Sequence, residues 1–260
     1  MPSLTKVEYS NGVGTITLND LKHLNALSAN LVEEILHGFD SCQRPETRAV
    51  ILRTVPGVKV FSAGHDIKEL PTHAVDPLTY NDPLRKIVRA IQVFPHPVVA
   101  MIEGSVWGGA SELVMACDIL IASEDSTFAI TPAKLGVAYN LVGILNFMRN
   151  VSLPVMKEIL FTAAPISAQR AQAIGIINHA VPTDELEAFT HKMVDKIRHN
   201  APLAITMIKE EMRVLSEAFP INPDVFEKIQ SGRRIVYNSK DYAEGIRSFF
   251  EKRKPDFTGE

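Results

Sequence analysis

Hydrophobic and polar residues follow two different patterns along the chain. Short apolar runs bounded by turn residues predict strands, and they lie at residues 7–10, 13–18, 49–53, 97–102, 117–123 and 126–130. Apolar residues that recur every three or four positions predict helices, at residues 30–39, 84–94, 141–150, 167–174, 184–199, 202–218, 224–237 and 241–252. Strands that alternate with helices imply parallel pairing through right-handed crossovers, and hence an α/β fold.

Local residues sharpen three of these assignments. Asn11 and Gly12 separate the first two strands and predict a hairpin. Ser28 occupies the position expected of an N-cap for the first helix. Residues 72–83 are polar and contain two prolines, Pro77 and Pro83. This segment is therefore either a flap near a site or a surface loop.

Two strands lead into stretches of small residues. The strand at 49–53 leads to the stretch FSAGHDIKEL at 61–70, and the strand at 97–102 leads to EGSVWGGASEL at 103–113. We expect each stretch to be a turn followed by a helix, beginning at about residue 67 in the first and at 113 in the second. Small residues let backbone N–H groups approach a ligand closely, although Asp66 could also be an ordinary helix cap. Two such turns can aim one N–H each at a shared oxygen, which makes an oxyanion hole.

Composition excludes several classes of protein. The chain has 260 residues, of which 46% are hydrophobic, enough for one well-buried core. Its formal charge of -3 argues against a nucleic acid or an anionic membrane as partner. Cys42 and Cys117 have no CxxC spacing, which indicates a reducing compartment. No targeting segment or apolar run of roughly 20 residues is evident, so we expect a soluble cytoplasmic protein.

Several sequence motifs of common enzymes are missing from the chain. There is no dinucleotide-binding or Walker-type glycine loop, no Gly-x-Ser-x-Gly elbow and no His-Glu-x-x-His pair. We therefore expect no metal site and no bound cofactor. The chemistry must come from the two turns.

The two turns together resemble the crotonase (enoyl-CoA hydratase/isomerase) superfamily. The resemblance extends over essentially the whole chain, down to residues 250–255. It implies a ββα superhelix in residues 1–200, followed by a helical region in residues 201–260. That region is expected to close the site for coenzyme A (CoA) and to assemble the chain into a homotrimer or a pair of trimers.

The resemblance also assigns roles to individual residues. The backbone N–H groups of His65 and Gly109 would bind the oxygen of an acyl-CoA thioester. The CoA contacts would map to Ala63, Gly64, Asp66, Ile67 and Lys68. Lys252 would reach a CoA phosphate, or else it is a solvated lysine at a helix end.

One difference from the family pattern bears on the reaction. Hydratases of the family use two glutamates; Glu112 matches the first, but Ala133 follows Pro132 where the second is expected. Hydration needs a held water and a proton donor, so this change puts hydratase activity in doubt. The motifs around residues 105–110 and 139–144 instead resemble the decarboxylating members of the family.

We therefore expect decarboxylation of methylmalonyl-CoA to propionyl-CoA through a thioester enolate. Tyr139 and Thr131 would orient the substrate carboxylate, unless Tyr139 is only a packing residue. Glu112 would reprotonate the enolate, hold a backbone group or simply lie buried, and the His65 side chain would help near the carboxyl group or the oxyanion. The alternatives are an enoyl-CoA hydratase or isomerase, and a non-catalytic relative that binds acyl-CoA or RNA. The choice between malonyl-CoA and methylmalonyl-CoA stays open, because one methylene-sized difference is worth only ~1–3 kcal/mol in a pocket.

Overall fold

The fold is described from a computed structural model that covers residues 3–71, 76–217 and 223–259. The predicted flap or loop at 72–83 lies partly outside this range, because residues 72–75 are not described.

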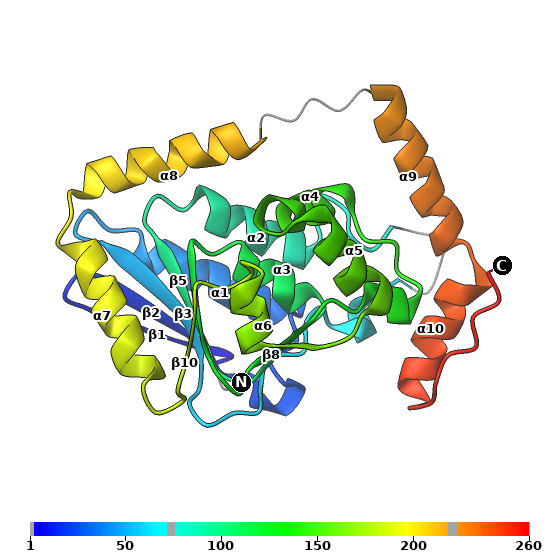
Figure 1. Ribbon diagram of the computed structural model, residues 1–260, viewed down its shortest axis with the longest axis horizontal. Coiled ribbons are helices and arrows are strands. Elements are labelled where there is room, and N and C mark those ends of the chain that lie inside the picture. The colour runs from blue at the N-terminus through cyan, green and yellow to red at the C-terminus, as the bar shows by residue number, and fades with distance from the viewer. Residues whose placement is uncertain (1–2, 72–75, 218–222, 260) are drawn as a thin grey trace.

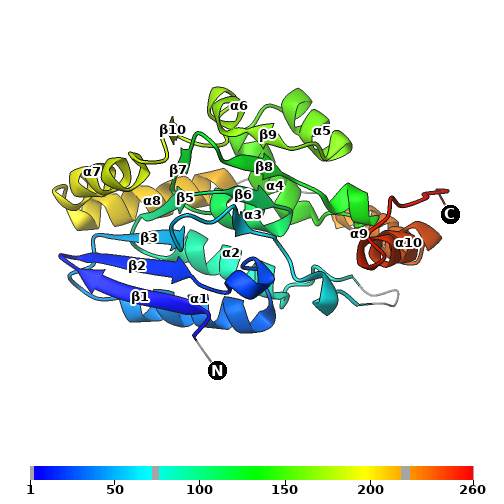
Figure 2. The ribbon, with the colours of Figure 1, turned by 90° about the horizontal axis from the view of Figure 1, so that it is seen from below.

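The main sheet has six strands in the order β1-β2-β3-β5-β7-β10 (Figures 1 and 2). They are β1 Thr5–Ser10, β2 Val13–Leu18, β3 Ala49–Thr54, β5 Val98–Ile102, β7 Ile119–Ser123 and β10 His179–Val181. β1 and β2 form the predicted antiparallel hairpin, and the other neighbours are parallel. Asn11 and Gly12 both have positive φ, as the tightest hairpin turns require.

From β3 to β8, the strands of a second, smaller sheet alternate along the chain with those of the main sheet. Its order is β4-β6-β8-β9, with β4 Val60–Ser62, β6 Ser105–Trp107, β8 Thr127–Ala129 and β9 Ile166–Ser167. The chain therefore passes from a strand of the main sheet to a strand of the small sheet and on to helical structure, three times in succession. This repeat is the ββα superhelix that the resemblance implies. The sequence did not predict β4 and β6, because each is only three residues long and overlaps a stretch of small residues that looks like a turn.

Both faces of the parallel strands are buried. Val50 and Leu52 of β3 belong to the large core beneath α1 (Ala29–Cys42) and α2 (Pro83–Val93). Ala49 and Ile51, which alternate with them, belong to a second core under α7 (Leu186–Arg198). A parallel strand covered on both faces shows a continuous apolar run, as residues 49–52 do.

The remaining helices of the strand-rich part are short. They are α3 Gly109–Met115, α4 Leu141–Asn150, α5 Leu153–Thr162 and α6 Ala168–Ala173. The prediction that the second turn leads to a helix beginning at residue 113 is wrong, because α3 begins at Gly109. Every residue of α3 is buried, so its first turn is made of small side chains that look like a turn in the sequence. Ile67–Glu69 forms only a single turn of 3₁₀ helix.

The C-terminal part is helical, as predicted. α8 Pro202–Glu217, α9 Pro223–Tyr237 and α10 Lys240–Phe250 follow α7. In both views α9 and α10 lie together at one end of the molecule, with α7 at the other (Figures 1 and 2). The Lys209 ammonium attaches α8 to the core, donating to Asp118 Oδ2 at 2.7 Å and to two backbone carbonyls. In the described part of the chain, no helix has the length and apolar character needed to cross a membrane.

Replacing Leu52 by alanine tests the central position of β3. Leu52 is fully buried and pairs in register with Ile16 and Ala100 on the two neighbouring strands. We expect Leu52→Ala to lower the free energy of unfolding by about 2–5 kcal/mol, measured by urea denaturation. The matched control is Leu21→Ala, at a 45% exposed leucine, which should change it by about 0.5 kcal/mol or less. Equal losses in the two variants would contradict the described core.

Candidate active site

The two small-residue turns converge at one point. His65 follows β4 and Gly109 follows β6, and these neighbouring strands are parallel, so their carboxyl ends meet at the same edge. A Cβ atom built on Gly109 would lie 3.3 Å from the His65 nitrogen. Among the described residues, neither N–H has a hydrogen-bond acceptor. Two free donors side by side are what an oxyanion hole requires.

Gly64 allows this close approach. Its φ is +87°, a left-handed conformation that favours glycine, and a Cβ atom there would lie 2.3 Å from the Trp107 carbonyl oxygen. Any larger residue would force the two turns apart. The glycine is therefore a structural requirement of the paired N–H groups.

A cavity of about 610 Å³ opens beside the first turn. Six of the residues predicted to bind CoA or to take part in catalysis line it, namely Ala63, His65, Asp66, Ile67, Lys68 and Thr131. The sequence analysis missed other lining residues, among them Lys22, His23, Lys134, Phe249 and Phe250. The last two come from α10, far away in the sequence. Lys252 is not among the lining residues.

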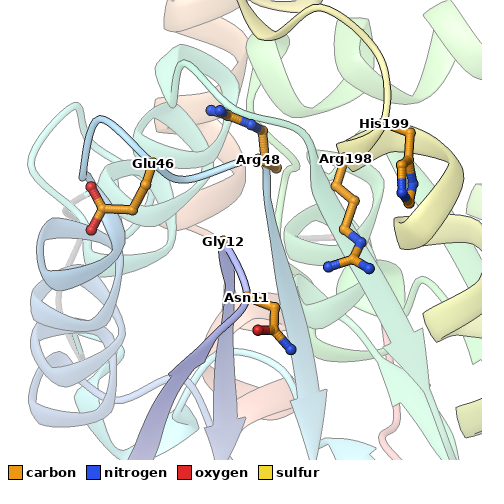
Figure 3. A pocket seen from close by; sticks show the side chains of 6 residues that line it. All are labelled: Asn11, Gly12, Glu46, Arg48, Arg198 and His199. Carbon is orange, nitrogen blue, oxygen red and sulfur yellow. The ribbon is translucent and has the colours of Figure 1, made fainter.

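Figure 3 shows a different depression, of about 330 Å³, at the turn between β1 and β2. Asn11, Arg48 and Arg198 are among the residues that line it. It lies at the amino end of β3, whereas the two N–H turns follow carboxyl ends of strands. It contains neither turn, so the larger cavity is the candidate site.

Glu112 lies buried between two partners. Its Oε1 accepts a bond of 2.9 Å from the Arg85 guanidinium, and its Oε2 accepts one of 2.6 Å from the Tyr139 hydroxyl. Burial raises the pKa of the Glu112 carboxyl, although Tyr139 and Arg85 both act to lower it. The same burial, together with the charge of Glu112, raises the pKa of Tyr139 well above its usual value. The phenol is therefore neutral, and its proton lies toward Glu112.

The structure thus gives Tyr139 a different environment from the expected one. We expected its hydroxyl to face the substrate carboxylate, but the single phenolic proton is donated to Glu112. Gly143 of α4 makes room for this arrangement, because a Cβ atom there would lie 2.3 Å from the Tyr139 ring and 2.9 Å from Glu112 Oε2. Asn140 caps the same helix by accepting from the Gly143 N–H.

The His65 side chain points toward α2 and not toward an open position. Its Nε2 lies 2.8 Å from Asp82 Oδ2, and its Nδ1 lies 3.1 Å from the Asp66 carbonyl oxygen. Burial alone would lower the pKa of this imidazole, but the hydrogen bond and the charge of Asp82 raise it above the usual value. Because both ring nitrogens face oxygens that only accept, the doubly protonated ring suits the site best.

Two residues that the sequence analysis missed complete this arrangement. Asp82 caps α2, accepting from the Leu84 N–H at 2.9 Å, and also holds His65. Arg85, three residues later, holds Glu112. Both side chains are almost fully buried. The signal available in the sequence was an arginine on the otherwise apolar face of a predicted helix.

Comparisons with known proteins agree with this geometry. The family described as enoyl-CoA hydratase/isomerase matches residues 8–260. The chain is 54% identical over 249 residues to the methylmalonyl-CoA decarboxylase of Escherichia coli (strain K12), covering 96% of this chain and 95% of that one. It is 32% identical over 251 residues to a probable mitochondrial enoyl-CoA hydratase of Dictyostelium discoideum, covering 95% and 88%.

A solved structure is similar over almost its entire length. It is a methylmalonyl-CoA decarboxylase in complex with 2-nitronate-propionyl-CoA, with a TM-score of 0.98, 53% identity and 99% of each chain covered. The predicted crotonase fold is thereby confirmed. The chain belongs to the enoyl-CoA hydratase/isomerase family, the crotonase superfamily.

Proposed function

We propose that this protein decarboxylates methylmalonyl-CoA to propionyl-CoA through a thioester enolate. The C–C bond to the carboxylate breaks, its electron pair moves into the enolate, and CO2 leaves. A proton then adds to the α-carbon. The substrate supplies both the electrons and the CoA group, so the reaction as proposed uses no further cofactor.

The paired N–H groups of His65 and Gly109 are suited to the developing charge. The thioester oxygen gains negative charge as CO2 leaves, and two aimed donors stabilise it more than they stabilise the substrate. Removing one such donor from an enzyme typically costs ~2.7–4 kcal/mol of transition-state stabilisation. The cavity beside these groups is large enough for the acyl end and part of the CoA chain.

The state of Glu112 is the observation that carries the choice of reaction. Both of its oxygens are bonded, one to Arg85 and one to Tyr139. Its carboxylate is therefore tied to two side chains of the protein, and Arg85 balances its charge. A free glutamate 4 Å from a substrate carboxylate would cost ~4 kcal/mol at an effective dielectric of 20. Tyr139 and Arg85 remove this repulsion, which favours decarboxylation over hydration.

Thr131 is the better candidate for orienting the substrate carboxylate. It lines the cavity, and its hydroxyl has no hydrogen-bond partner among the residues that the structure describes. Thr131 Oγ1 lies 3.3 Å from a Cβ atom built on Gly108, the residue that directly precedes Gly109. A hydroxyl donor at this position holds the substrate carboxylate so that the C–C bond that breaks lies out of the thioester plane. Tyr139 is instead bonded to Glu112.

The His65 ring lies next to the paired N–H groups, and Asp82 raises its pKa, which favours the protonated form. A protonated ring would help to stabilise the forming enolate, with part of its charge offset by the Asp82 carboxylate. Asp82 holds this ring on the side away from the cavity.

The rim of the cavity suits an anionic nucleotide. Lys22, Lys68 and Lys134 supply positive charge, and Phe249 and Phe250 supply aromatic surface. We assign the CoA phosphates to these lysines and the adenine to the phenylalanines. Lys252, two residues beyond Phe250, stays a prediction for the phosphate contact.

We also propose that the helical region from residue 201 onward assembles the chain into a homotrimer or a pair of trimers. Large apolar side chains are exposed on α8 and α9, including Leu203, Met212, Leu215 and Ile235. Burying them against a second copy would remove this surface from water. The cytoplasmic location stays a prediction.

A panel of three thioesters tests the proposed function. Methylmalonyl-CoA, malonyl-CoA and crotonyl-CoA are offered to the purified protein, and CO2 release and loss of the enoyl absorbance are followed. We expect CO2 from methylmalonyl-CoA and no hydration of crotonyl-CoA. Hydration without CO2 release would establish the alternative function of enoyl-CoA hydratase.

Thr131→Val tests the assignment of the carboxylate contact. Valine keeps the shape but removes the donor, so we expect kcat to fall by about 10–100-fold, the effect of losing one hydrogen bond to a charged group. KM should change much less, because the CoA contacts remain. Thr131→Ser, which retains the hydroxyl, should keep most of the activity. Equal activity in the valine and serine variants would remove Thr131 from the mechanism.

The pH dependence of stability tests the His65–Asp82 pair. The folded-state pKa of His65 is raised, so the stabilisation is fully present below the unfolded value of about 6.5 and is lost as pH rises through the folded value. We expect the free energy of unfolding to fall over this range in the wild type. In His65→Gln the free energy of unfolding should decrease less over the same pH range. An identical pH profile in both proteins would contradict the His65–Asp82 pair.

A further inference from the structure

The C-terminal helices build a small core of their own that reaches both sides of the site. This core consists of Leu70, Tyr237, Tyr242 and Ile246, with Ile67, Val137 and Ala138 packed against it. Ile67 and Leu70 follow the first N–H turn, and Ala138 directly precedes Tyr139. α9 and α10 lie together at this end of the molecule in both views (Figures 1 and 2).

One hydrogen bond connects α9 to the backbone next to Tyr139. The Tyr237 hydroxyl donates to the Ala138 carbonyl oxygen at 2.5 Å. Tyr237 is only 2% exposed, and burial raises its pKa to about 12, so the donor is neutral. Arg233 Nη2 donates to the same hydroxyl oxygen at 3.3 Å. A donor on the oxygen polarises the hydroxyl and strengthens its own bond to the carbonyl.

Arg233 extends these contacts to the segment on the other side of the site. Its two terminal nitrogens lie 2.7 Å from the two carboxylate oxygens of Asp76. Asp76 lies in the loop that leads to Asp82, which caps α2 and is the partner of His65. The side chain of Arg233 is 8% exposed and that of Asp76 is 26% exposed, so this ion pair is partly shielded from water. Continuous polar contacts therefore run from Asp76 through α9 to Ala138.

We propose that Tyr237 is a positioning residue, which holds the backbone of Tyr139 through the Ala138 carbonyl so that the phenol stays on Glu112. Tyr237 contacts neither the cavity nor the paired N–H groups, so it acts only through the loop. Its effect on rate rests on the proposed function, whereas its effect on the loop does not. Without this hydroxyl, the loop loses the one side-chain donor that the described residues supply to Ala138.

Hydrogen exchange tests the effect on the loop. Tyr237→Phe keeps the ring and its packing and removes only the hydroxyl. The matched control is Tyr242→Phe, at an equally buried tyrosine whose hydroxyl donates to the Pro71 carbonyl oxygen at 2.9 Å. In the substrate-free full chain we expect amides of residues 136–143 to exchange about tenfold faster in Tyr237→Phe, as the loss of one buried hydrogen bond predicts. The control should match the wild type there. The same exchange in all three proteins would overturn the proposal.

A double-mutant cycle with Tyr139→Phe tests the effect on rate. We expect Tyr237→Phe to lower kcat for CO2 release by about tenfold, with KM little changed. In the Tyr139→Phe background it should add almost nothing, because both substitutions act on the same contact with Glu112. Fully additive effects would show that Tyr237 acts elsewhere. If the wild type releases no CO2, the proposed function fails and the exchange comparison alone decides the role of Tyr237.

Discussion

The first turn of α2 holds the two halves of the site together. Asp82 caps this helix and bonds the ring of His65, while Arg85, one turn later, forms an ion pair with Glu112 of α3. The first contact fixes the turn after β4, and the second fixes the helix that begins at Gly109. Both pairs are buried, and breaking a buried pair leaves an uncompensated charge. The relative position of the two N–H groups therefore depends on one helical turn.

Around this turn, the superhelix and the C-terminal helices have separate tasks. The parallel strands bring the carboxyl ends of β4 and β6 to the same edge, which sets where the paired N–H groups lie. α10 supplies the aromatic side of the cavity, and Tyr237 of α9 donates to the backbone carbonyl before Tyr139. Segments nearly 200 residues apart in the sequence thus meet around one cavity.

Sequence reasoning identified most of this fold and part of the site, for physical reasons. Strands such as β3 and β5 were predicted because a strand buried on both faces is apolar throughout. β4, β6 and the start of α3 were missed because short strands, and a helix whose first three residues are glycine, alanine and serine, look like turns. Asp82 and Arg85 were missed because their importance comes from partners that lie 17 and 27 residues away, respectively. The direction of the Tyr139 hydroxyl was not predictable either, since it depends on the space left by Gly143.

The sequestered Glu112 also limits how one activity of this family can be converted into another. Placing a glutamate at Ala133 would restore the second carboxylate of a hydratase, but Glu112 would still be tied to Arg85 and Tyr139. Freeing Glu112 from both partners would require changes in α2 and in the loop before α4 at the same time. Converting a decarboxylase site of this kind into a hydratase site therefore needs several coordinated substitutions. A glutamate in place of Ala133 alone is not enough.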